Sequence, residues 1–150
     1  MTEDCTYKRP ESVLVVVHSI DGMILLLKRT DIEDFWQSVT GSLKWGETAP
    51  AAAVRELKEE TGINAGLRLV DWHYSVRFDI IDKFKNRYRP GTIQNLENLY
   101  SIEIERDHHI KLDPHEHITY QWNSVPQAME RTWSWSNRDA IAAVAKKYWP

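Results

Sequence analysis

Residues 41–63 read GSLKWGETAPAAAVRELKEETGI, and this stretch decides how the rest of the chain is interpreted. It predicts a helix over residues 48–61. Thr48 is available as an N-cap, Pro50 falls in the first turn, and Gly62 follows the last helical residue, where a left-handed cap is common. Because four glutamates fall within and just before this helix, the stretch predicts a strand-loop-helix unit with an acidic surface.

The acidic side chains of this helix fall on one side of it. An α-helix turns by 100° per residue, so Glu60 lies about 40° from Glu56 and Glu59 about 60° to its other side. The apolar stripe on the opposite side consists of Ala53, Val54 and Leu57. We expect that stripe to pack on a sheet, with the acids pointing outward into a cleft or into solvent.

Two interpretations of the acidic stripe are open at this point. Like-charged neighbours cost only about 0.2–0.5 kcal/mol per pair, and Arg55 and Lys58 partly offset them, so the stripe could be a solvated face. It could equally be a site for a hard cation, because Mg²⁺ prefers oxygen ligands and often binds through carboxylates and substrate phosphates. The surrounding residues have to decide between the two.

The remaining elements follow from hydrophobic patterning. Residues 12–18 and 23–29 are apolar runs joined by Asp21-Gly22, which is a strong signal for a β-hairpin. Two further strands and two helices are predicted: strands at 67–81 and 96–104, and helices at 124–131 and 137–148. This order predicts an α/β (α+β) fold, a mixed sheet flanked by helices, in one domain over residues 1–150.

Composition excludes several classes of protein. The 150 residues carry a net charge of −3, so the whole-chain positive charge of a duplex-DNA binder is missing, and we do not expect nucleic acid as a partner. Cys5 is the only cysteine and has no partner for an intrachain disulfide. The apolar runs are too short to span a membrane. The first ten residues contain no apolar signal region, so we expect a cytoplasmic protein.

Residues 41–63 resemble the Nudix box, G-x5-E-x7-R-E-U-x-E-E-x-G-U, where U is aliphatic. Every fixed position is matched: Gly41, Glu47, Arg55, Glu56, Leu57, Glu59, Glu60, Gly62 and Ile63. The resemblance implies a Nudix-type α/β/α sandwich. It also implies hydrolysis of a phosphoanhydride in a nucleoside-diphosphate-like substrate, with Mg²⁺ or Mn²⁺ as cofactor.

The resemblance also implies a role for each charged residue of the box. Glu56 and Glu60 are the expected principal metal ligands, and Glu59 is an additional ligand or the general base. Arg55 is expected to orient a carboxylate of the box through a salt bridge, and Glu47 to be a structural acid or an acid of the outer shell around the metal. Gly41 is expected to lie in the loop before the helix, where a side chain would obstruct the backbone conformation.

Other stretches resemble a bacterial branch of this family, the dihydroneopterin triphosphate pyrophosphatases, also described as dATP pyrophosphohydrolases. These stretches are YKRP at 7–10, DFWQSVTGS at 34–42, RYRPG at 87–91 and WSNR at 135–138. The resemblance implies cleavage of dihydroneopterin triphosphate to the monophosphate and pyrophosphate. The substrate contacts it implies are Lys8, Arg29, Thr40, Phe78, Asp79, Ile80, Ile81 and Ser134. It also implies a further metal ligand or general base at Glu116.

Alternatives are left open by the sequence. A general nucleoside triphosphate pyrophosphohydrolase that sanitises nucleotides would carry the same box, and so would an enzyme acting on RNA 5′ ends, although the acidic balance disfavours the latter. A non-catalytic nucleotide-binding module is the third alternative, and the complete box argues against it. Zinc is disfavoured because the histidine spacing matches no structural zinc pattern. The sequence does not distinguish a monomer from a homodimer.

Overall fold

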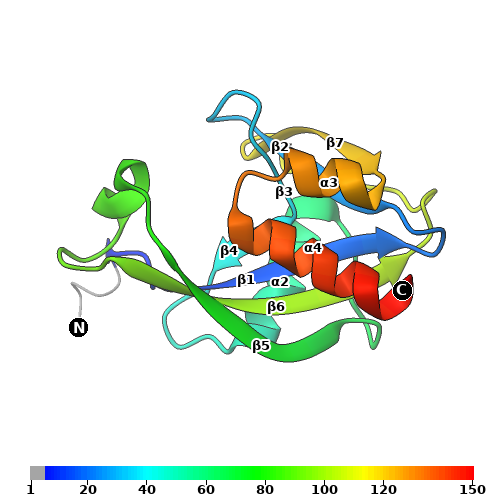
Figure 1. Cartoon of the computed structure of the whole chain (residues 1–150). Helices are drawn as coiled ribbons and strands as arrows, with labels where there is room; N and C mark the ends of the chain where they lie inside the picture. The colour runs from blue at the N-terminus through cyan, green and yellow to red at the C-terminus, as the bar shows by residue number, and fades with distance from the viewer. Residues whose placement is uncertain (1–5) are drawn as a thin grey trace.

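The computed structural model describes residues 6–150 and consists of a mixed β-sheet with helices on both faces (Figure 1). The strands are β1 (Glu11–Ser19), β2 (Ile24–Arg29), β3 (Trp36–Gln37), β4 (Val39–Ser42), β5 (Val70–Asp79), β6 (Gln94–Ile104) and β7 (His117–Asn123). The helices are α2 (Ala49–Thr61), the 3₁₀ helix η1 (Asp82–Arg87), α3 (Val125–Arg131) and α4 (Trp135–Tyr148). Cys5 lies outside the described residues.

The sheet is organised around β1. The main path runs in the order β3-β2-β1-β6-β5, while β4 pairs with β1 and β7 pairs with β2. β1 is parallel to β6, with Glu11 opposite Leu96, and antiparallel to β2 and β4. β1 is therefore covered on both edges and on both faces, which explains its unbroken apolar run.

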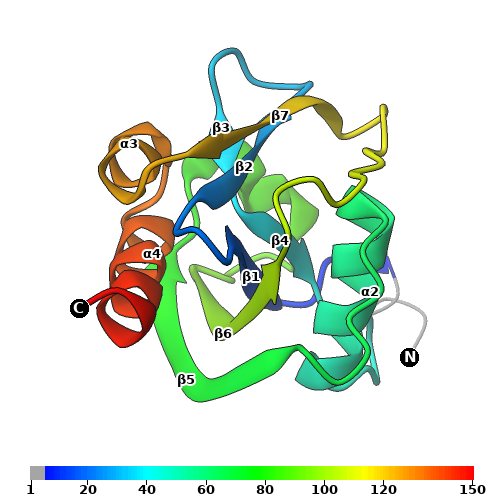
Figure 2. The same ribbon diagram turned by 90° about the vertical axis from the view of Figure 1, so that its right-hand side faces the viewer.

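Alternate residues of β1 point into separate cores. Val13, Val15 and Val17 belong to a core cluster that includes residues of α2, whereas Leu14 and Val16 belong to a second cluster with residues of α3 and α4. Figure 2 shows the resulting layers, with α2 on one side of the strands and α3 and α4 on the other. The predicted α/β/α sandwich is confirmed.

Helix α2 begins and ends as the sequence predicts. The Thr48 hydroxyl accepts a hydrogen bond from the Ala51 N–H, and Gly62 ends the helix in the left-handed region at φ 76°. The expected apolar stripe is wrong in one position, because Val54 is 45% exposed while Ala52 is fully buried. The expected direction of the acids, into a cleft or into solvent, is confirmed for Glu56, which lines a cleft, and for the exposed Glu59. It is wrong for Glu60, which is buried and does not line that cleft.

The other predicted elements are confirmed with small changes in their ends. The hairpin forms, with His18 opposite Ile24, and α3 is closed by a capping box at Ser124. Two strands were not predicted, the two-residue strand β3 and the strand β7. β7 pairs antiparallel with β2, and the pairing shifts register between Lys28 and Arg29. Among the described residues, no helix is both long enough and apolar enough to cross a membrane.

The contrast between Leu57 and Val54 tests how α2 packs. Leu57 is fully buried in the α2-side core, so Leu57→Ala should lower the free energy of unfolding by about 2–5 kcal/mol. The matched variant Val54→Ala on the exposed side should change it by less than about 0.5 kcal/mol. Chemical denaturation of both variants measures the difference, and equal losses would contradict this packing.

Candidate active site

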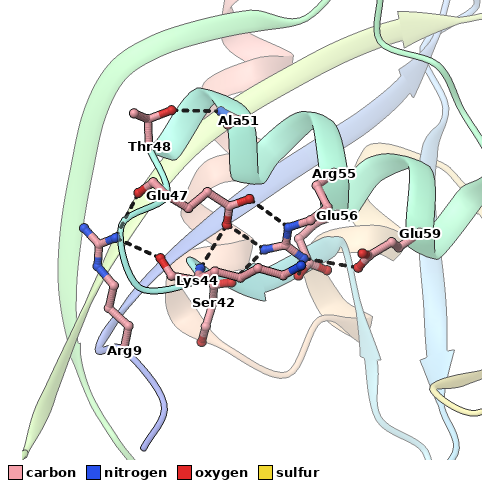
Figure 3. A network of polar contacts seen from close by, with 9 residues as sticks. All are labelled: Arg9, Ser42, Lys44, Glu47, Thr48, Ala51, Arg55, Glu56 and Glu59. Atoms are coloured by element: carbon pink, nitrogen blue, oxygen red, sulfur yellow. Dashed lines mark hydrogen bonds and ion pairs between the residues drawn. The ribbon is translucent and has the colours of Figure 1, made fainter. Parts of the chain in front are cut away.

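Arg55 ties α2 to the turn that precedes it (Figure 3). Its Nε and Nη2 donate to the two carboxylate oxygens of Glu47, both at 2.8 Å, and Nη2 also donates to the Ser42 carbonyl. These hydrogen bonds from Arg55 hold the pKa of Glu47 down at about 2. The second anchor is the Lys44 N–H, which donates to Glu47. Glu47 is thus a structural acid, with both oxygens committed to the turn.

The same guanidinium reaches the acids of the helix. Arg55 Nη1 lies 2.8 Å from Glu56 Oε1 and 3.2 Å from Glu59 Oε2. The Glu56 contact is mostly buried and the Glu59 side chain is about half exposed. The guanidinium of Arg55 therefore positions the carboxylate of Glu56 and also holds the half-exposed side chain of Glu59 on the surface of the helix.

Gly41 allows Glu56 to lie directly against the sheet. A Cβ built on Gly41 would stand 2.2 Å from Cδ of Glu56, which is far inside van der Waals contact. The expected position of Gly41 is wrong, because it lies within β4, opposite Val13 of β1, and not in the loop. The glycine is required by the space that the Glu56 carboxylate occupies and not by a strained turn.

Glu60 is the most buried acid of the helix. It is 1% exposed, and neither of its carboxylate oxygens has a hydrogen-bond partner within residues 6–150. Burial, together with the nearby carboxyls of Glu56 and Glu116, raises the pKa of Glu60 well above its usual value. A buried carboxylate beside other carboxylates is costly unless a positive charge compensates it.

Glu60, Glu116 and His117 form a group that could supply that compensation by holding a metal ion. One ligand atom from each of the three lies within 4.8 Å of the others. His117 is buried, and burial lowers its pKa to about 4, so its ring is neutral near pH 7. Its Nε2 lies 3.4 Å from Nε2 of Gln37, and its Nδ1 has no hydrogen-bond partner among the described residues. With Glu56 nearby, this oxygen-rich donor set fits a divalent cation.

A cleft of about 510 Å³ opens beside this group. Its lining contains all of the expected substrate contacts and two of the expected catalytic acids: Lys8, Arg29, Thr40, Phe78, Asp79, Ile80, Ile81, Ser134, Glu56 and Glu116. Arg55, Glu59 and Glu60 do not line it. The structure thus brings residues from the beginning, middle and end of the chain to one cleft.

Cations and aromatic rings share one wall of the cleft. The side chain of Phe84 lies between two guanidinium groups, with its ring centre 5.3 Å from Cζ of Arg29 and 4.6 Å from Cζ of Arg87. Asp31 holds Arg29 through a two-point contact of 2.8 and 2.6 Å. Desolvation in the cleft, followed by the charges of Arg87 and Arg29, lowers the pKa of Lys8. This wall is suited to a polyphosphate.

Two of the expected substrate contacts, Thr40 and Ser134, also form hydrogen bonds within the fold. The Thr40 hydroxyl donates to the Val13 carbonyl, and the Ser134 oxygen accepts from the Asn137 N–H as the N-cap of α4. Both still line the cleft. A substitution at Thr40 or Ser134 would therefore remove a hydrogen bond within the fold together with any contact to the substrate.

Sequence reasoning missed several residues that the structure places at the site. Arg87 lies within the RYRPG stretch, so its cationic side chain could have been named from the same resemblance. His117 stands next to Glu116, although its pairing on β7 was not expected. Asn95 and Glu97 are buried polar residues within a strand, and no signal in the sequence separates them from outward-facing polar residues.

Comparison with known proteins agrees with this geometry. The NUDIX domain matches residues 8–144, which is most of the chain. The chain belongs to the Nudix family. Within the Nudix box, Arg55, Glu47 and Gly41 position the acids, while Glu56 and Glu60 face the side where the metal-binding group and the cleft meet.

Named Nudix relatives cover almost the whole chain. Dihydroneopterin triphosphate diphosphatase of Escherichia coli K12 is 44% identical over 143 residues, which is 93% of this chain and 94% of the relative. The enzyme of that name from Haemophilus influenzae is 37% identical, over 95% of this chain and 89% of the relative. The solved structure of the E. coli dihydroneopterin triphosphate pyrophosphohydrolase has a TM-score of 0.87 at 42% identity, covering 95% and 99% of the two chains.

The contact between Gly41 and Glu56 predicts a defect in metal binding. Gly41→Ala should displace the Glu56 carboxylate and weaken Mn²⁺ binding by about 10- to 100-fold, as changes that misorient a metal ligand commonly do. Titration calorimetry measures the affinity. Because Glu56 is the group displaced, Gly41→Ala should cause no further loss in a Glu56→Ala background. A second loss of similar size would contradict this explanation.

Proposed function

We propose that this Nudix protein hydrolyses dihydroneopterin triphosphate to dihydroneopterin monophosphate and pyrophosphate, with Mg²⁺ as its cofactor and Mn²⁺ as a substitute. The observation that carries the proposal is that the group of Glu60, Glu116 and His117, which fits a divalent cation, lies beside a cleft. One wall of this cleft is formed by the cations Lys8, Arg29 and Arg87. Relatives of that name, 37% and 44% identical over nearly the full length, support this choice of substrate.

Glu56 and Glu60 would hold the metal, with His117 beside them and Glu116 on the side of the group that lines the cleft. A bound divalent cation would supply charge neutralisation on the phosphates and a more acidic water. The position of Glu56 is fixed by the hydrogen bond from Arg55 and by the space beside Gly41, which has no side chain. Glu59 would take an outer position, since Arg55 draws it and it does not line the cleft.

Lys8, Arg29 and Arg87 would hold the triphosphate. The positive charges of Arg87 and Arg29 lie close enough to Lys8 to contribute to lowering its pKa. An anion bound among the three side chains would relieve this repulsion between like charges. The two-point contact with Asp31 and the stacking on Phe84 fix the plane of the Arg29 guanidinium. Fixed guanidinium groups lose less freedom when a phosphate binds than mobile ones do.

Glu116 is the acid best placed to accept a proton from the attacking water. It is exposed and lines the cleft, whereas Glu60 is fully buried and Glu59 is held by Arg55. The aromatic pair Phe35 and Trp133, with ring centres 5.0 Å apart, also lines the cleft and offers an apolar surface for the pterin. The cytoplasmic location stays a prediction from the sequence.

A comparison of substrates tests the function. With saturating Mg²⁺, pyrophosphate release should give a kcat/KM on dihydroneopterin triphosphate at least about tenfold above that on dATP, dGTP or triphosphorylated RNA. Removal of the metal with EDTA should abolish release, and Mn²⁺ should restore it. Equal rates on dATP would identify a general nucleoside triphosphate pyrophosphohydrolase, and no release from any substrate would identify a binding module.

Neutralising Glu60 should separate catalysis from folding. Glu60→Gln removes a metal ligand, so turnover should fall by more than about tenfold. The free energy of unfolding without metal should not fall, because burial already disfavours the charged form of this side chain. Glu130→Gln, at an exposed position on α3, is the matched control and should keep full turnover. Near-normal turnover in Glu60→Gln would remove Glu60 from the mechanism.

A further inference from the structure

Glu97 is a buried acid at the inner end of the cleft that the reaction described above does not use. It lies on β6 opposite Ser12 of β1, is 7% exposed, and lines the cleft. Its side chain also borders a second cavity of about 380 Å³, which is lined mainly by apolar residues, among them Trp72, Leu99 and Trp135. Glu97 and Leu14 are shared by the linings of both cavities, so Glu97 stands at the wall between them.

The carboxyl group of Glu97 has little compensation within the protein. No ion pair to Glu97 is formed within residues 6–150. Burial raises its pKa to about 7, and the hydrogen bond from the Ser136 hydroxyl offsets only part of that effect. Burying a carboxylate with few donors is costly, so a ligand that supplies further N–H donors would stabilise the charged form of Glu97.

An unsatisfied acceptor lies two residues away from Glu97 on the same strand. Asn95 is 2% exposed and lines the cleft; its Nδ2 donates to the Ser12 hydroxyl at 2.8 Å, while its Oδ1 has no partner among the described residues. Residues two apart in a strand point to the same face of the sheet. Asn95 and Glu97 therefore present acceptors side by side, and a ligand rich in donors would satisfy both.

Asn137 makes this end of the cleft rigid. Its side chain accepts from the Ser38 N–H and donates to the Ser38 hydroxyl, both at 2.9 Å, which links α4 to the segment between β3 and β4. Asn137 is buried and lines the cleft beside Ser134. A ring that enters this end meets groups whose positions are already fixed, which favours discrimination between rings.

The two ends of the cleft differ in charge. Glu97 lies where the cleft borders the second cavity, and Lys8 does not. The charges of Arg87, Arg29, Glu56 and Glu116 contribute to the pKa shift of Lys8, whereas burial and the Ser136 hydroxyl are what shift the pKa of Glu97. A substrate that places its triphosphate among the cations would direct the far edge of its ring toward Glu97. In a pterin that carries the triphosphate chain at C6, this far edge bears the 2-amino group and the N3 hydrogen. Two parallel N–H donors match the two oxygens of one carboxylate, as a guanidinium does.

We propose that Glu97 selects the ring of the substrate by accepting hydrogen bonds from the 2-amino and N3–H groups of a 2-amino-4-oxopyrimidine ring, with Asn95 Oδ1 accepting a further one. This assignment rests on the proposed function. The equivalent edge of adenine offers a lone pair at N1 beside its amino group, which a carboxylate meets with repulsion. Glu97 is thus a specificity residue that acts at the end of the cleft opposite the chemistry.

Glu97→Gln is the variant that tests the assignment, because it keeps the shape of the side chain and replaces one acceptor with a donor. The ratio of kcat/KM on dihydroneopterin triphosphate to that on dATP should fall at least about tenfold, mainly through a higher KM for the pterin. Inhibition by dihydroneopterin, which has the ring and no phosphates, should weaken by a similar factor. Inhibition by inorganic triphosphate, which has no ring, should weaken less than inhibition by dihydroneopterin.

Controls separate this role from a structural one. Glu103→Gln changes an exposed acid on the same strand and should leave the substrate ratio as in the wild type. A purely structural Glu97 would lower activity on both substrates together, so an unchanged ratio in Glu97→Gln overturns the assignment. Failure of the wild-type protein to cleave the pterin triphosphate would instead overturn the proposed function, so the two failures are distinguishable.

Discussion

Glu56 and Glu60 bring two carboxylates to the side of α2 that packs on the sheet, and the surrounding structure compensates for this unfavourable placement. The backbone of Gly41 leaves room for the first carboxylate, and Arg55 neutralises it from the side. The carboxylate oxygens of Glu60 have no hydrogen-bond donor among the described residues. The fold therefore holds one acid in place with its own groups and leaves the other to be satisfied by a cation.

The elements next to strong local signals could be predicted from the sequence. Asp21-Gly22 predicted the hairpin, and Thr48 and Gly62 predicted the ends of α2, because each of these residues has a specific backbone role. β7 could not be predicted in the same way. Most of its residues are exposed, and its partner β2 is far away in the chain, so no alternation of apolar and polar residues marks it.

The candidate site could be predicted as a set of residues but not as a geometry. Local helix periodicity placed Glu56 and Glu60 on one stripe, yet it did not show that Glu60 is buried at the edge of the core and does not line the cleft as Glu56 does. The burial of Glu97 depends on α4 closing over β6, which is a tertiary contact that no local pattern encodes. Resemblance to a family supplies residues of shared function and says little about such positions.

The parallel pairing of β1 with β6 has a consequence for biosynthesis. Val13–Val17 is translated well before β6, the strand that covers one of its edges. Until then the most apolar strand keeps an open edge, which is the feature that promotes intermolecular β-pairing. Because the cleft is built on these same two strands, no shorter nascent chain can bind substrate, and ligand cannot assist folding before β6 is in place.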